Sequence, residues 1–141
     1  MKLKVKVRLH NGAFMPKINA NGDWIDLCTT EDIRFSKPIA NRLKRNTKEE
    51  GRIVEFDSKL LDFGLSFELP KGFSLYIVPR SSLYKKYGII LSNSMGIIDN
   101  SYNGDNDIIK FGAIALKGSF IPAGTRIAQF EIRPNQFATP W

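Results

Sequence analysis

A carboxylate and an aromatic ring stand three residues apart in the stretch 92–104, and this pair is the first candidate for chemistry in the chain. Asp99 could act as a general base that deprotonates a water, and the ring of Tyr102 could pack on a ligand. The alternatives are purely structural: Asp99 could be a turn carboxylate, and Tyr102 could be a core aromatic. Two apolar runs around a polar turn at Asn93 predict a β-hairpin over 89–98. Such a hairpin could present backbone N–H and C=O groups to a flat ligand beside the acid.

A second candidate site lies at Arg80-Ser81-Ser82, between a predicted strand and a predicted helix over 82–87 that ends at Gly88. A helix start offers unpaired N–H groups that bind phosphate, and an arginine adds a forked cation that matches phosphate oxygens. Taken alone, the same residues indicate no more than a helix start beside a surface arginine.

The elements that must position these residues are mostly short strands separated by Gly and Pro turns, which is typical of a β-sandwich, jelly roll or barrel. A segment of mixed charge over 36–52 is predicted to be a solvated loop, and a loop that binds a partner is the sharper alternative. The predicted strands cover 2–9, 24–28, 53–56, 64–69, 73–78, 89–91, 95–98, 109–116 and 126–132.

A chain of 141 residues with 43% hydrophobic and 25% charged residues predicts a single domain over 1–141. No apolar run is long enough to cross a bilayer. The single cysteine, Cys28, favours a reducing compartment, so a cytoplasmic protein is expected. The formal net charge of +7 favours anionic partners, either a nucleoside triphosphate or nucleic acid. Nucleic acid is the weaker of the two, because no zinc or stacked-aromatic motif is present.

Several short motifs together carry a resemblance to a known family. The run Gly96-Ile97-Ile98-Asp99-Asn100-Ser101-Tyr102-Asn103-Gly104 resembles the third motif of the trimeric dUTP pyrophosphatases. The run 79–83 resembles their second motif, 124–129 their fourth, and Asp26-Leu27 the end of their first. The order and spacing fit, and the resemblance covers nearly the whole chain.

The resemblance implies an all-β, jelly-roll-like β-barrel with one short helix, assembled as a homotrimer in a bacterial or phage-infected cytoplasm. It implies Mg²⁺-dependent hydrolysis of dUTP to dUMP and pyrophosphate, with Asp99 activating a water that attacks the α-phosphorus. It also implies no direct protein ligand for Mg²⁺, with Asp26 acting through water. The residues implied for uracil and deoxyribose are Asn93, Gly96, Ile97, Ile98, Tyr102 and Lys110, and those for the phosphates are Arg80, Ser81, Ser82 and Gln129.

The sequence departs from the family pattern in two places, and two alternatives stay open. Trp24 stands where the family has small residues, and no glycine-rich fifth motif is visible after Gly124. The second departure and the sequence pI of 9.6 keep open a nucleotide-binding regulatory protein with weak or no turnover. A dCTP deaminase ranks lower, because its chemistry needs a glutamate on the strand after the third motif and 111–116 contains no acid.

Overall fold

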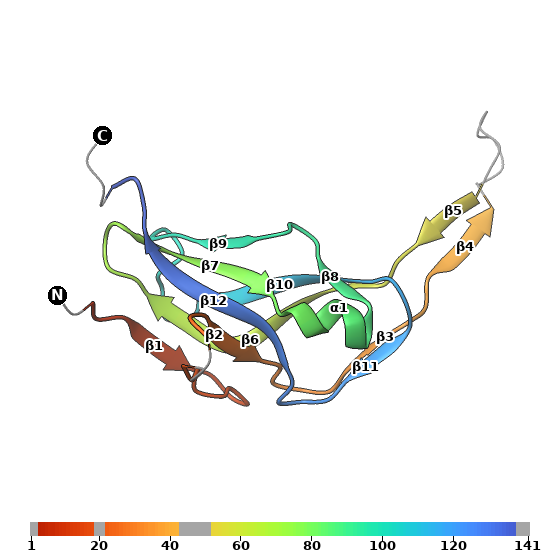
Figure 1. The fold of residues 1–141 in the computed structure, drawn as a ribbon, viewed down its shortest axis with the longest axis horizontal. Helices are drawn as coiled ribbons and strands as arrows, with labels where there is room; N and C mark the ends of the chain where they lie inside the picture. The colour runs from red at the N-terminus through yellow and green to blue at the C-terminus, as the bar shows by residue number, and fades with distance from the viewer. Residues whose placement is uncertain (1–2, 19–21, 43–51, 138–141) are drawn as a thin grey trace.

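The computed structural model describes residues 3–18, 22–42 and 52–137. Two four-stranded sheets make up its body, with strand orders β1-β6-β10-β8 and β2-β12-β7-β9, and Figure 1 shows their elements. The strands are β1 (Lys6–Leu9), β2 (Ile25–Cys28), β3 (Ile33–Phe35), β4 (Ile39–Arg42), β5 (Arg52–Glu55), β6 (Ser58–Glu68), β7 (Phe73–Pro79), β8 (Ile89–Leu91), β9 (Gly96–Ile98), β10 (Ile108–Ala115), β11 (Ser119–Ile121) and β12 (Arg126–Pro134).

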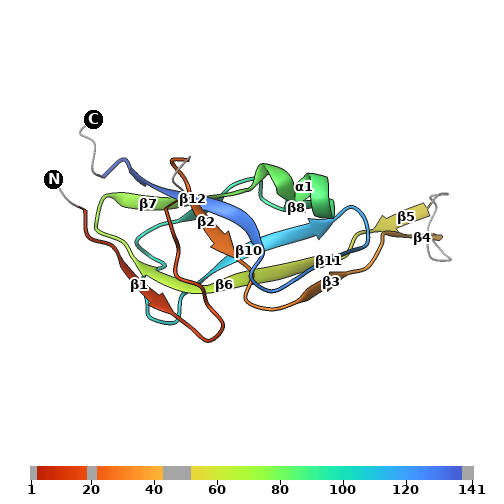
Figure 2. The same ribbon diagram turned by 60° about the horizontal axis from the view of Figure 1, so that its bottom comes forward.

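The hydrophobic core lies between the two sheets, which appear as two layers in Figure 2. Alternate residues of β6 and β10 point inward, as a half-buried strand requires. Phe67 on β6 meets Phe130 on β12 edge to face, with ring centroids 5.4 Å apart, so aromatic packing joins the sheets. This architecture confirms the predicted all-β class.

The helix α1 (Ser81–Tyr87) begins one residue earlier than predicted and is the one helix in the part of the chain that the structure describes. Arg80 precedes it in extended conformation, and Gly88 ends it at φ 64°, where a side chain would be strained. The Gly88 N–H donates to the Tyr84 carbonyl at 2.9 Å. Buried Leu83 fixes the helix on the body.

The predicted β-hairpin over 89–98 is wrong, because its two strands belong to different sheets. β8 pairs with β10, whereas β9 pairs with β7. Ile89 and Leu91 face the core from one sheet, while Ile98 packs against it from the other. The two apolar runs thus reach the core from opposite sides, so the turn 92–95 crosses between the layers. Ser94 takes a φ of 56° in that turn.

The predicted loop over 36–52 is also wrong in part, since β4 pairs with β5, and 43–51 lie outside the described residues. Ala40 is opposite Val54 and Asn41 is opposite Ile53, so the two strands pair. The charged residues of this segment hide the alternation of apolar and polar residues that would have indicated strands. Figure 1 shows this strand pair extending away from the two sheets. The short pair β3 and β11 was not predicted, and β6 begins six residues before the predicted strand.

Within the described ranges, none of the helical structure is long and apolar enough to span a membrane.

Candidate functional site

Asp26, Arg80 and Arg126 form a charged group that we call the arginine–aspartate cluster. Asp26 is 9% exposed on β2. Arg80 Nε lies 3.4 Å from its Oδ1, and Arg126 Nη1 lies 3.3 Å from its Oδ2. A carboxylate this buried is tolerated because it is paired, and it holds both guanidinium groups in place. Two cations against one anion leave the cluster with a net positive charge that favours an anionic ligand.

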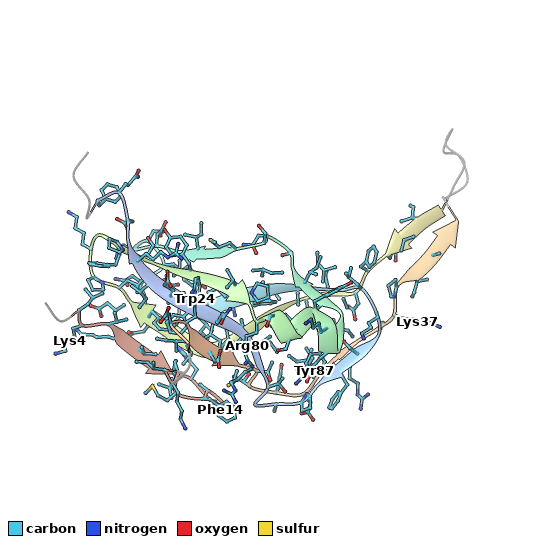
Figure 3. All side chains as sticks on the ribbon, viewed as in Figure 1. Lys4, Phe14, Trp24, Lys37, Arg80 and Tyr87 are labelled. Carbon is cyan, nitrogen blue, oxygen red and sulfur yellow. The ribbon has the colours of Figure 1, made fainter. Side chains whose placement is uncertain are left out.

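The remaining predicted phosphate-binding residues lie close to this cluster. Ser81 and Ser82 form the first turn of α1 directly after Arg80, and Figure 3 shows Arg80 where β7 gives way to that helix. Gln129 on β12 is opposite Asp26 on β2 and Val78 on β7. The structure thus brings Arg80, Ser81, Ser82 and Gln129 to one region, together with Asp26. Sequence reasoning did not single out Arg126, although it lies inside the fourth motif.

A cavity of about 390 Å³ adjoins the arginine–aspartate cluster. Cys28 stands in its wall, and burial raises the pKa of this thiol, an effect that the nearby Arg126 opposes. The thiol therefore stays protonated at neutral pH and is a poor nucleophile. The cavity is lined by Phe14, Met15, Lys17, Ile18, Asp26, Cys28 and Arg126.

Asp99 is exposed just beyond the end of β9, and a neighbouring serine engages its carboxylate. The Ser101 hydroxyl and the Ser101 backbone N–H, the latter at 2.8 Å, both donate to Asp99 Oδ1. The side-chain hydrogen bond, followed by the backbone one, holds the pKa of Asp99 below its ordinary value. Asp99 is therefore ionised at neutral pH and able to accept a proton. The nearby Tyr102 hydroxyl donates to the Ile108 carbonyl at 2.7 Å.

The residues predicted to contact uracil lie on β9 and the turn before it. Gly96 is buried opposite Ile77, whereas Ile97 is 61% exposed and Asn93 is exposed in the turn. β9 is the edge strand of its sheet, so some of its backbone groups point away from β7. Such groups can bind a planar ligand.

Lys110 lies on β10, in the sheet opposite β9. Its Nζ is 3.9 Å from Asp62 Oδ2 on the neighbouring β6, and both side chains are partly exposed. The predicted contact between Lys110 and the nucleotide stays a prediction.

The two groups of candidate residues do not meet within one chain. Ile98, the residue before Asp99, pairs with Leu75 near the start of β7, whereas Arg80 follows the end of that strand. Five residues of extended chain separate Leu75 from Arg80, which corresponds to about 16 Å. Asp99 and the arginine–aspartate cluster thus lie towards opposite ends of β7.

A magnesium ion would find few protein ligands here. In the described ranges, no three His, Cys, Asp or Glu side chains are grouped so that they could hold a metal. Both oxygens of Asp26 already lie near an arginine. These donors fit a Mg²⁺ that arrives on the nucleotide, ligated by phosphate oxygens and waters, as this ion prefers.

Comparison with known proteins finds the same family at the level of sequence and fold. The dUTPase family model matches residues 47–134. The chain is 41% identical over 132 residues to the SPbeta prophage-derived deoxyuridine 5'-triphosphate nucleotidohydrolase YosS of Bacillus subtilis, covering 94% of this chain and 80% of that one.

Solved structures share the fold. A dUTPase of Staphylococcus bacteriophage 80alpha with dUpNHpp superposes with a TM-score of 0.71 at 18% identity, covering 98% of this chain and 85% of that chain. A dUTPase from phage phi11 of S. aureus, described with a structural Mg(II) ion, gives 0.72 at 17% identity, covering 98% and 94%. These likenesses confirm the predicted jelly-roll-like fold with one short helix.

Proposed function

We infer that this chain, which belongs to the dUTPase family, hydrolyses dUTP to dUMP and pyrophosphate. Membership confirms the resemblance drawn from the short motifs, and with it the class of nucleotide hydrolase. The observation that carries the proposal is that two groups of residues with complementary chemistry lie at opposite ends of β7. An ionised, exposed carboxylate at Asp99 lies at one end of β7, and the positive arginine–aspartate cluster lies at the other.

In the proposed reaction, Asp99 of one copy accepts a proton from a water while the water oxygen bonds to the α-phosphorus. The bond from that phosphorus to the bridging oxygen breaks, and its electron pair leaves with pyrophosphate. A positioned general base of this kind contributes about 10²–10⁴-fold in rate. The lowered pKa of Asp99 favours its basic form at neutral pH.

The arginine–aspartate cluster of the second copy would neutralise charge on the β- and γ-phosphates. Arg80 supplies the cation, and Ser81, Ser82 and Gln129 supply hydrogen bonds. We propose that Mg²⁺ enters with the nucleotide and is part of the substrate. Asp26, held by two arginines, would reach that ion only through water.

Uracil would be read by Asn93 and by the backbone of Gly96, Ile97 and Ile98. A cytosine amino group would face a backbone donor there and leave buried groups unpaired, at about 1–3 kcal/mol per group. The ring of Tyr102 would pack on deoxyribose and exclude a 2′-hydroxyl, and Lys110 is retained as a candidate for the sugar or a phosphate. We propose that two copies complete each site within a homotrimer of three-fold symmetry. The cytoplasm is the compartment that this function and a lone cysteine favour.

Pyrophosphate release from dUTP, measured with and without Mg²⁺, tests the proposal, and dCTP, dTTP and UTP serve as controls. We expect Mg²⁺-dependent release from dUTP well above the other three. Deamination of dCTP would instead favour the deaminase alternative, although β10 carries no acid. Tight dUTP binding without pyrophosphate release would favour the regulatory alternative and would contradict the proposed turnover.

A further inference from the structure

Leu69, the first residue after β6, has both of its backbone polar groups bonded to side chains of one loop. Its N–H donates to Asn103 Oδ1 at 2.8 Å, and its carbonyl accepts from Asn100 Nδ2 at 2.8 Å. Asn100 Nδ2 also lies 3.2 Å from the Pro70 carbonyl. Leu69 is 3% exposed, so these buried groups depend on the two asparagines as partners. We call this pair, Asn100 and Asn103, the asparagine clamp.

The clamp surrounds the candidate sugar-contacting residue. Asn100 comes two residues before Tyr102 and Asn103 comes directly after it, while Asp99 immediately precedes Asn100. β9 ends at Ile98 and β10 begins at Ile108, so the loop 99–107 has no strand ladder to hold it. Its position is set by side-chain hydrogen bonds, of which the clamp supplies three.

The far end of the loop is anchored separately. The hydroxyl of Ser66, which is 2% exposed, donates to the Asp105 carbonyl at 2.8 Å. His10 Nε2 lies 3.1 Å from the same hydroxyl, and Arg8 forms an ion pair with Asp105 at 3.2 Å. Because this end is held elsewhere, loss of the clamp would loosen the segment around Tyr102 without releasing the whole loop, and the hydrogen bond from the Tyr102 hydroxyl to the Ile108 carbonyl at 2.7 Å would remain.

We propose that Asn100 and Asn103 are positioning residues that set the discrimination between dUTP and UTP. They act through Tyr102, because they fix the position of its ring relative to the turn between β6 and β7. This inference rests on the proposed function. A ring on a loop that is fastened by one 2.8 Å hydrogen bond on each side of it yields less to a 2′-hydroxyl than a ring on a loosened loop.

The two halves of the clamp need opposite chemistry, which supplies matched variants. Asn100 acts as a donor, so Asn100→Asp sets a carboxylate against two carbonyl oxygens and removes the hydrogen bonds that Asn100 donates. Asn103 acts as an acceptor, so Asn103→Asp keeps its bond to the Leu69 N–H. Asn106→Asp adds the same charge to the same loop, at an exposed residue without a side-chain hydrogen bond in the described part of the chain.

Two measurements decide: the dUTP/UTP ratio of kcat/KM, and hydrogen exchange of the peptide that contains Leu69. We expect Asn100→Asp to lower the ratio about threefold or more, the worth of one hydrogen bond, and to raise exchange. Asn103→Asp and Asn106→Asp should leave both readouts near the parent's. Should Asn100→Asp fail to fold, Asn103→Ala leaves the Leu69 N–H without its acceptor and is expected to lower the ratio similarly.

An equal drop in all three aspartate variants would assign the effect to charge and overturn the proposal. An unchanged ratio in both Asn100→Asp and Asn103→Ala would also overturn it. Inactivity of the parent chain would refute the proposed turnover alone. The discrimination is then measured as the ratio of dUMP to UMP binding by calorimetry on the same variants, with the same expected order.

Discussion

At the scale of single residues, the Asp99–Ser101 pair defines what the candidate base can do. Two hydrogen bonds to one carboxylate oxygen favour the charged form and leave the other oxygen free to face a water. The low pKa of Asp99 weakens it as a base but keeps it fully ionised. The geometry therefore keeps the Asp99 carboxylate charged but makes it a weaker base.

Replacement of Asp99 by asparagine removes the proton acceptor while keeping the size of the side chain. We expect Asp99→Asn to bind dUTP and to lose roughly 10²-fold or more in kcat. Steady-state kinetics with calorimetric binding of a non-hydrolysable dUTP analogue separates the two effects. Turnover within a few-fold of the parent would remove Asp99 from the reaction.

Replacement of Ser101 by alanine tests the cause of the low pKa, because the serine hydroxyl is its largest contributor. Without that bond the pKa of Asp99 rises toward its ordinary value. The acidic limb of the pH profile of kcat/KM then moves to higher pH. A carbon-detected NMR titration of the Asp99 carboxyl measures the shift directly, with Ser58→Ala as the control. An unmoved pKa would mean that another group stabilises the carboxylate.

At the scale of elements, the crossing from β8 to β9 depends on a glycine in a neighbouring strand. Ser92 N–H donates to the Gly112 carbonyl at 2.7 Å at the start of the crossing turn. A Cβ on Gly112 would overlap the Ser92 hydroxyl, while the Ser92 Cβ would remain at 3.4 Å, an ordinary contact. The Ser92 hydroxyl can therefore keep its present position beside β10 only while residue 112 has no side chain.

Gly112→Ala should destabilise the protein by about 1 kcal/mol or more, because the extra methyl group displaces the Ser92 hydroxyl. In the double variant with Ser92→Ala the overlap disappears. That variant should be as stable as Ser92→Ala alone or slightly more, since alanine restricts the unfolded chain. Chemical denaturation of the four proteins gives the coupling. Additive effects would show that the two residues do not meet.

Most strands could be predicted from sequence because their alternation and their turns are local signals. The sheet that a strand joins depends on residues far away in the sequence. The run 89–98 therefore predicted a hairpin, although the chain passes there from one sheet to the other. β3 and β11 have three residues each, too few to show a period. The motif residues were found by resemblance. Contacts such as Arg126 to Asp26, 100 positions apart in the chain, became visible only in the fold.

At the scale of the whole molecule, the proposed homotrimer predicts that Asp99 of one copy and Arg80 of another complete one site. Asp99→Asn and Arg80→Ala should each be inactive alone. Mixed trimers formed by refolding the two together should regain activity, because some interfaces join an intact Asp99 to an intact Arg80. Pyrophosphate release from the mixture, compared with each variant treated alike, measures this. No recovery from verified mixed trimers would place both residues of a site in one chain.

The chain leaves the two sheets before β4 and returns to them after β5, and hydrogen bonds join the two places. Ser36 N–H donates to the Asp57 carboxylate at 2.8 Å, and the Asp57 carbonyl accepts from Ala115 N–H at 2.9 Å. The base of this strand pair is therefore fastened by residues that lie outside β4 and β5. Exposed segments of this kind tolerate insertion well. For protein engineering, we expect that a foreign peptide or a reporter domain inserted between β4 and β5 would leave the register of the two four-stranded sheets unchanged, because this strand pair forms a separate sheet.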